Sequence, residues 1–425
     1  MKGEIIAIGD ELTSGRILNT TSGYAARKLF DAGYTIHAMS TIGDTPTLIG
    51  EALLRAIGRV DFIIVTGGLG ATDDDLTNEA VSQALNRPTM PNLEILAQIR
   101  DHLKNHQESV ESTLEKLAWL PSGAQAFNPA SRVAGYQLIH QDTPIFFLPG
   151  VPDEMKDLMS NAVLPKLSAW EAGSRLQTCQ RIYKIFGISE SELNRKIKRL
   201  NLKDEIKIGY YPVFPDVHVS IISRGKDPAA SRQHFEYSCW KVEQAIGKDI
   251  YGTGQDELES VVGELLKKMG LTLAAAESCS GGLFSHRITR IPGSSLYFKG
   301  GAVTYSNDMK TRFLGVEPEL IKRHGAVSHE VARAMADGII KNSDADLGIS
   351  ITGIAGPDGG SAEKPVGTVY FGIGDRKKIV TSVYYFKGDR HRIQTLAVHT
   401  GLNLLRLHLL RQIKNNQNQE APDHP

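Results

Sequence analysis

The chain has 425 residues, too many for one hydrophobic core, so two or three domains are expected. Lysine and arginine together number 48, as do aspartate and glutamate, and this balance gives no overall field that would recruit nucleic acid or a membrane surface. The three cysteines lie far apart without metal-ligand spacing, no apolar run reaches membrane-spanning length, and the first residues read as a strand rather than a signal peptide, so we expect a cytoplasmic protein.

The first part of the chain alternates apolar strands with amphipathic helices. Strands are predicted at residues 4–8, 34–42 and 61–66, and helices at residues 19–32 and 49–57. Such alternation is typical of a doubly wound α/β sheet with right-handed crossovers.

Polar turns follow these strands at their carboxyl ends, where open α/β sheets bind ligands. The third strand runs into a glycine-rich turn whose amides can cradle a phosphate, and the residues of this turn expected to contact substrate are Gly67, Gly68, Gly70 and Thr72. Clustered carboxylates need a cation or plain solvent to relieve their repulsion, and the candidate metal ligands are Asp10, Glu11, Asp44, Asp74 and Asp75. The alternative is a solvated acidic helix start, which the helix dipole favours.

The N-terminal domain is predicted to span residues 1–170. Helices are expected at residues 93–106 and 111–120, a strand at residues 144–148, and an amphipathic closing segment at residues 151–167.

This half is similar to the MoaB/MogA-like molybdopterin-binding fold in the version found at the N-terminus of CinA (competence/damage-inducible protein A) proteins. The resemblance lies in residues 9–12, 43–44, 66–77 and 148–155. It implies a divalent-metal-dependent, potassium-assisted ADP-ribose pyrophosphatase. The sequence departs from the family at Ala71, where proline is usual, and at residues 131–135, where a Gly-x-Ala-Pro-Gly-like segment is usual.

Residues 171–252, here called the middle module, have a different pattern. Strands at residues 182–186, 206–211 and 217–223 and helices at residues 189–200 and 229–246 indicate a small α+β module that resembles the KH-like insert of CinA proteins. It lacks a Gly-x-x-Gly clamp, and acidic residues partly offset its basic run, so nucleic-acid binding is not expected. A structural or dimer-contacting role is the better interpretation.

The C-terminal domain is predicted over residues 253–412, with a disordered polar tail at residues 413–425. A linker at residues 252–257 precedes a helix at residues 258–269 and a buried strand at residues 271–276.

The strand is followed by Glu-Ser-Cys-Ser-Gly-Gly, residues 277–282, here called the nucleophile turn. A strand-to-helix turn leaves backbone N–H groups free for a phosphate or an oxyanion; Ser278 could attack, and Gly281 and Gly282 let a ligand come close. The alternative is that Glu277 and Ser278 only cap a helix.

Three motifs in order, at residues 277–282, 303–310 and 353–360, resemble the nicotinamide mononucleotide deamidase domain of the CinA family over residues 257–410. The resemblance implies hydrolysis of the carboxamide of nicotinamide mononucleotide to nicotinate mononucleotide and ammonia, without a cofactor.

By analogy with Ser-Lys hydrolases, Ser278 is assigned as the nucleophile and Lys310 as its base. Lys310 must then be neutral, hence desolvated, whereas most lysines lie on helix surfaces. Tyr305 could relay the proton, and Ser280 is the second candidate nucleophile. Cys279 has no activating histidine beside it in the sequence and is expected to be a buried, inert thiol.

Substrate capture needs amides and a cation for the phosphate. Arg390 could supply a bidentate guanidinium. The remaining residues expected to contact the substrate are Glu277, Gly281, Gly282, Gly293, Ser294, Ser295, Thr352 and Gly353.

Together these features predict a homodimeric enzyme that recycles pyridine nucleotides, with nicotinamide mononucleotide and ADP-ribose as substrates. The competing interpretation is a nucleotide or pterin sensor, linked to competence or DNA damage, whose pockets bind without turnover.

Overall fold

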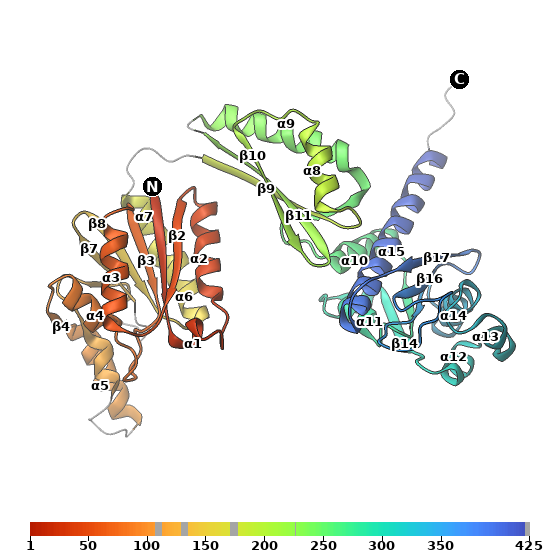
Figure 1. Cartoon of the computed structure of the whole chain (residues 1–425), viewed down its shortest axis with the longest axis horizontal. Helices are drawn as coiled ribbons and strands as arrows, with labels where there is room; N and C mark the ends of the chain where they lie inside the picture. Colours follow the sequence, from red (N-terminus) through yellow and green to blue (C-terminus); the bar gives the residue numbers. More distant parts are fainter. Residues whose placement is uncertain (107–112, 129–134, 171–176, 226, 421–425) are drawn as a thin grey trace. The chain divides into compact units, whose positions relative to one another are not determined.

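The computed structural model describes residues 1–106, 113–128, 135–170, 177–225 and 227–420, and it divides into two compact units (Figure 1). One unit comprises Met1–Gln180 with Ser223–Gln233, and the other comprises Arg181–Ile222 with His234–Pro425. Within the described ranges, no helix is both long enough and apolar enough to span a membrane.

The N-terminal domain is built on a six-stranded sheet in the order β2-β1-β3-β8-β7-β6, in which β2, β1, β3 and β8 are parallel. Its strands are β1 (Lys2–Ile8), β2 (Thr35–Ile42), β3 (Phe62–Thr66), β6 (Gln125–Ala126), β7 (Tyr136–His140) and β8 (Thr143–Leu148). Its helices are α1 (Asp10–Thr13), α2 (Thr20–Asp31), α3 (Pro46–Ile57), α4 (Thr77–Ala84), α5 (Leu93–His106), α6 (Pro152–Leu158) and α7 (Leu164–Trp170), with a π-helical turn at Met159–Val163.

Both faces of this sheet are buried, as the apolar strands predicted. Ile5 of β1 joins the cluster that contains Leu29 of α2, whereas its neighbour Ile6 joins the cluster that contains Leu53 of α3. Alternate residues of one strand therefore feed two cores, which is the doubly wound arrangement.

The segment predicted as a helix at residues 111–120 differs. Within its described part, Thr113–Ala118 forms a short 3₁₀ helix, and Trp119–Pro121 is a strand, β5, paired antiparallel with β4 (Thr89–Pro91). A helix over 111–120 would have to end before Pro121, and Leu120 is buried in the strand pairing. Of the departure at residues 131–135, only Gly135 lies in the described part of the chain.

The middle module is a four-stranded sheet in the order β10-β11-β9-β12 with helices α8 (Glu190–Lys198) and α9 (Pro228–Ile246). The Ser189 hydroxyl accepts the N–H of Glu192, as the helix-start pattern predicted. The strands are β9 (Gln177–Ile185), β10 (Ile206–Val213), β11 (Asp216–Gly225) and β12 (Ile250–Thr253). β12 includes residues that the sequence assigned to the start of a linker.

The C-terminal domain has a five-stranded sheet in the order β14-β13-β15-β16-β17. β14, β13 and β15 are parallel, and β16 and β17 are added antiparallel. The strands are β13 (Leu273–Glu277), β14 (Phe298–Val303), β15 (Leu347–Gly353), β16 (Thr368–Gly374) and β17 (Ile379–Tyr385), and the helices are α10 (Leu258–Met269), α11 (Leu283–Thr289), α12 (Asn307–Leu314), α13 (Pro318–His324), α14 (His329–Ser343) and α15 (Arg390–Glu420).

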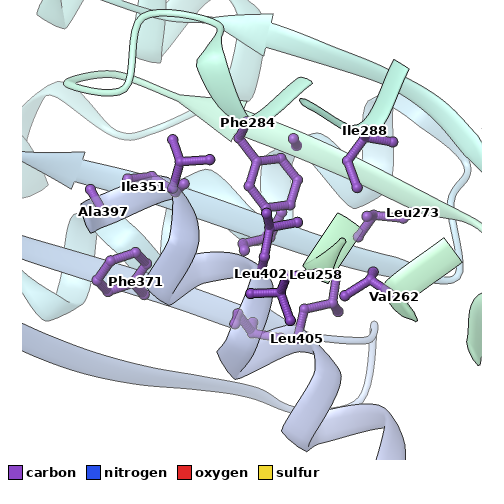
Figure 2. Close-up of a cluster of buried hydrophobic side chains, with 14 of the residues drawn as sticks. Leu258, Val262, Leu273, Phe284, Ile288, Ile351, Phe371, Ala397, Leu402 and Leu405 are labelled. Atoms are coloured by element: carbon purple, nitrogen blue, oxygen red, sulfur yellow. The ribbon is translucent and has the colours of Figure 1, made fainter. Parts of the chain in front are cut away.

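The main core of this domain lies between the sheet and helices α10, α11 and α15 (Figure 2). Figure 2 shows Phe284 and Ile288 of α11 in the same cluster as Leu402 and Leu405 of α15. A second cluster, with Met335 of α14 among its members, covers the other face. The predicted α/β class is therefore confirmed in both large domains.

The end of the chain departs from the expected disordered tail. α15 continues to Glu420, so residues 413–420 are helical, and only residues 421–425 of the predicted tail lie outside the described part.

Leu402→Ala tests the packing of α15. Leu402 is fully buried, so truncation leaves a cavity, and we expect the unfolding free energy of this domain to fall by about 2–5 kcal/mol. Hydrogen exchange of peptides from β13 and β15 during urea titration measures it. Leu410→Ala, on the same helix but 37% exposed, is the matched control; equal losses in both variants would contradict the assigned core.

Candidate active site

Ser278 lies at the carboxyl end of β13, in the nucleophile turn that leads into α11. Its backbone N–H donates to the Ile351 carbonyl at 2.9 Å, which fixes it against the adjacent strand β15. Gly281 and Gly282 have φ of 64° and 94°, left-handed values that a side chain would disfavour, and these reverse the chain into the helix. The hydroxyl is thus held at the edge of the sheet where β14 and β15 also end.

Lys310 lies on α12, the helix that follows β14, and its side chain reaches the Ser278 hydroxyl. Its Nζ lies 3.0 Å from Ser278 Oγ, 2.9 Å from the Thr304 carbonyl and 3.4 Å from the Tyr305 carbonyl. The residue is only 1% exposed, and this burial lowers the pKa of Lys310.

These contacts suit either charge state of the amine. A protonated Lys310 can donate to all three oxygens, and a neutral one can donate to the two carbonyls while its lone pair accepts the Ser278 O–H. Because burial lowers the pKa of Lys310, its neutral form costs less than that of a surface lysine, and the neutral form is the one that could take the hydroxyl proton. The structure brings together the two residues that the sequence assigned as nucleophile and base.

Glu277 differs from its predicted role in substrate contact. Its side chain is fully buried, and its two carboxylate oxygens accept the N–H groups of Gly282, Phe284 and Ser285 and the Ser285 hydroxyl. Because these donors occupy the carboxylate, Glu277 caps α11 and holds the turn instead of facing a ligand.

Among the described residues, the backbone N–H groups of Cys279 and Ser280 make no hydrogen bond to another residue, although that of Cys279 lies against its own thiol. In the same part of the chain, the buried Ser280 hydroxyl has no hydrogen-bond partner, Lys310 included. Burial raises the pKa of the Cys279 thiol to about 12, which keeps it protonated and inert, as expected. The donors available for an oxyanion are therefore these two amides rather than those of the glycines.

Tyr305 and Arg390 meet beside the nucleophile turn. Arg390 Nη2 donates to the Tyr305 phenol oxygen and Nη1 to the Gly356 carbonyl, each at 2.7 Å. Tyr305 is 61% exposed, so this pair faces solvent, and the guanidinium keeps further N–H donors for an anion.

Gln394 was not singled out by the sequence. It lies one helical turn after Arg390 on α15, and its Nε2 donates to the Cys279 carbonyl at 2.8 Å. The spacing of four residues from Arg390 was the only available signal, because no motif includes it.

The predicted phosphate-binding residues Gly293, Ser294 and Ser295 lie away from Ser278 within this chain. They precede β14, and Phe298 at the start of β14 pairs with Leu273 at the start of β13. Because the strands are parallel, these residues lie at the opposite end of the sheet from Ser278, roughly 16 Å away for a five-residue strand.

Thr352 and Gly353 end β15 at the same edge of the sheet as Ser278, but both are used in contacts within the domain. The Thr352 hydroxyl donates to the Ala326 carbonyl, and a Cβ on Gly353 would lie 2.7 Å from the Thr368 carbonyl. Gly353 therefore serves the contact between β15 and β16.

A second candidate site is the N-terminal cavity, of about 610 Å³, at the carboxyl ends of β1 and β3. Its lining includes the predicted Gly67, Gly68 and Gly70, with Ala71 beside them. The acidic residues that line it are Glu11, Asp44, Asp74, Asp75 and Glu154, whereas the described lining contains no lysine, arginine or histidine.

The predicted metal ligands are arranged differently from a closed metal cage. Asp10 and Asp44 each accept the other's backbone N–H, and Asp75 accepts both the N–H and the hydroxyl of Thr72. Among the described residues, no three histidine, cysteine or acidic side chains are grouped to hold a metal ion. Burial, followed by neighbouring carboxylates, raises the pKa of Asp44, so this carboxylate would gain from a cation.

Three family models match the chain in order: a probable molybdopterin binding domain over residues 4–169, the damage-inducible protein CinA KH domain over residues 180–252, and the CinA C-terminal domain over residues 255–409.

Full-length relatives match across all three domains. The chain is 54% identical to a CinA-like protein of Desulfotalea psychrophila over 410 residues, covering 96% of this chain and 99% of that protein. It is 38% identical to a CinA-like protein of Citrifermentans bemidjiense, covering 96% and 98% of the two chains. Among solved structures, the competence/damage inducible protein CihA of Agrobacterium tumefaciens is 40% identical, with a TM-score of 0.35, 36% of this chain covered and 93% of that chain.

Lys310→Met tests the burial of the amine through stability. The pKa of Lys310 in the folded chain lies below its ordinary 10.5, so the unfolded chain binds more protons and wild-type stability rises with pH up to about 10.5. We expect Lys310→Met to unfold at a higher temperature than wild type at pH 7, with the difference shrinking toward pH 10. The exposed Lys322→Met is the control, and a pH-independent difference for Lys310→Met would refute the lowered pKa.

Proposed function

The chain belongs to the CinA family, and on that premise we propose that its C-terminal domain hydrolyses the carboxamide of nicotinamide mononucleotide to nicotinate mononucleotide and ammonia. The observation that carries the proposal is the buried Lys310 amine 3.0 Å from the Ser278 hydroxyl. A serine with a desolvated lysine base is a known solution for acyl transfer.

The first half of the reaction transfers the acyl group to the enzyme. Ser278 Oγ adds to the carboxamide carbon while its proton moves to Lys310 Nζ, and the N–H groups of Cys279 and Ser280 are the donors for the oxyanion. Lys310 then gives that proton to the amide nitrogen, the C–N bond breaks, and ammonia leaves with the nicotinoyl group esterified to Ser278.

The second half reverses these roles. Water adds to the ester carbon as Lys310 takes its proton, the C–O bond to Ser278 breaks, and the proton returns to the serine oxygen. Arg390, beside Tyr305 at the exposed edge of the turn, is the cation available for the phosphate of the nucleotide. The Tyr305 phenol is hydrogen-bonded to Arg390, and Tyr305 remains the proposed proton relay.

Ser278→Ala and Ser280→Ala separate the two candidate nucleophiles. Ammonia release from nicotinamide mononucleotide should fall by about 10³-fold or more in Ser278→Ala, because no other described hydroxyl is hydrogen-bonded to Lys310. Ser280→Ala should keep most of the activity. Release by Ser278→Ala at the wild-type rate would reject the mechanism, and no release by wild type would favour the sensor.

The N-terminal cavity supports a second activity, the hydrolysis of ADP-ribose to AMP and ribose 5-phosphate. Its described lining carries five acidic side chains, and Lys116 lies beside it with Nζ 2.9 Å from the Thr72 carbonyl, so bound cations would reduce the repulsion between these carboxylates and a diphosphate. Asp44, together with Glu11 or Asp74, would hold a divalent ion, since Mg²⁺ in phosphate sites takes one or two protein carboxylates and substrate oxygens for the rest. When bound, such an ion activates water and neutralises charge on the phosphates.

The chain's own residues bind and orient the substrate in this cavity. Gly67 and Gly68 have positive φ, which turns the loop after β3, and a Cβ at either would collide with the Ile8 carbonyl or the Thr77 hydroxyl, so both glycines are needed for the close packing of this turn at the cavity. The assistance by potassium, the homodimer and the cytoplasmic location stay predictions.

Metal removal and Asp44→Asn test the second activity. AMP release from ADP-ribose should vanish in chelator and return with Mg²⁺. Asp44→Asn should lower AMP release at least about tenfold, because it removes a carboxylate that would hold the cation. The exposed Asp101→Asn is the matched control. Unchanged AMP release in chelator would exclude the cation requirement.

A further inference from the structure

Helix α11 is only seven residues long, yet it carries the nucleophile turn at its start. Its first N–H groups are taken by Glu277, and its apolar face packs in the main core through Phe284 and Ile288 (Figure 2). Its last turn carries Arg287, whose guanidinium makes a two-point ion pair with the buried carboxylate of Glu259 on α10. The helix is therefore fixed at both ends by charged groups.

Arg287 also contacts His399 of α15. Its Nη1 lies 3.0 Å from His399 Nδ1, and because a guanidinium can only donate, Nδ1 must accept. The proton of the neutral ring then resides on Nε2.

The far side of His399 meets the middle module. Nε2 lies 2.7 Å from Asp216 Oδ1 on β11, a close polar contact although its angle is poor for a hydrogen bond. The other oxygen of Asp216 accepts the Tyr251 hydroxyl at 2.7 Å. A continuous polar path thus runs from Asp216 through His399 and Arg287 to α11.

The contact between the middle module and the C-terminal domain is also apolar and buried. Tyr251 of β12 is a member of the main core of the C-terminal domain, and the Phe186 ring lies 4.5 Å from the His399 ring. The buried Arg406 of α15 donates to the carbonyls of Lys248 and Ile250. Contacts this close pack the end of β9 and the residues around β12 against α15.

We propose that Asp216 of the middle module is a positioning residue for the nucleophile turn, acting through His399 and Arg287. His399 lies on the helix that also carries Arg390 and Gln394, and Gln394 donates to the Cys279 carbonyl within the turn. Fixing His399 therefore restrains both helices that flank Ser278. The inference rests on the proposed amidase function for its kinetic effect, but the restraint itself does not depend on turnover.

Asp216→Asn in the full chain is the central test. The substitution keeps the size of the side chain and removes the charge that holds His399, so kcat for ammonia release should fall roughly 10- to 100-fold, as small misplacements of reacting groups do, while KM changes less than about twofold. Hydrogen exchange of the Gly282, Phe284 and Ser285 amides should speed up, because these are the N–H groups bound to Glu277.

Variants of His399 provide the rescue comparison. His399→Gln keeps an acceptor for Arg287 and a donor for Asp216 and should retain most of kcat, whereas His399→Leu keeps the bulk alone and should behave like Asp216→Asn. Asp204→Asn, an exposed acid in the same module, is the control and should match wild type.

The outcomes separate the two proposals. Wild-type kcat and wild-type exchange in Asp216→Asn would overturn the positioning role, as would a lower melting temperature with both unchanged, and the amidase function would stand. Absence of ammonia release by wild type would reject the amidase function, and the exchange measurement would still decide whether Asp216 restrains the turn.

Discussion

The C-terminal domain depends on one constraint: a lysine amine must stay out of water while touching a serine hydroxyl. Burial of Lys310 disfavours its charge, and the Thr304 and Tyr305 carbonyls accept its hydrogens, so the buried amine is hydrogen-bonded. The glycine-ended turn and the Glu277 cap then hold the Ser278 hydroxyl within 3.0 Å of the amine.

Burial also disfavours a charged side chain in the N-terminal cavity, but there the side chain is an acid and its pKa is raised. There, burial and neighbouring acids raise the pKa of a carboxylate, Asp44, so that the site gains from a cation. The N-terminal cavity thus has excess negative charge, whereas the site around Ser278 disfavours the positive charge of Lys310. Both lie at the carboxyl ends of parallel strands, where side chains from successive strands converge.

The sequence predicted those features that depend on local pattern. The buried strands and the helix ended by the left-handed Gly270 follow from apolar runs and glycine positions. The pairing of Ser278 with Lys310 came from the resemblance to the CinA family and the analogy with Ser-Lys hydrolases. Sequence-based prediction failed where partners are distant or the sheet edge is undetermined. Gly293 to Ser295 carry suitable groups but enter β14 at its other end, and Gln394 and Asp216 reach α11 or its turn only through tertiary packing.

The place of Tyr251 bears on how this chain can be divided. This residue precedes the boundary that family models draw between the second and third domains, yet its ring fills part of the third domain's interior. A fragment begun at the modular boundary would expose a hollow lined by apolar side chains and leave Arg406 without the carbonyls of its neighbours. The family-model boundary therefore does not coincide with the packing boundary. A C-terminal domain that folds alone would need another side chain to fill the space that Tyr251 occupies here.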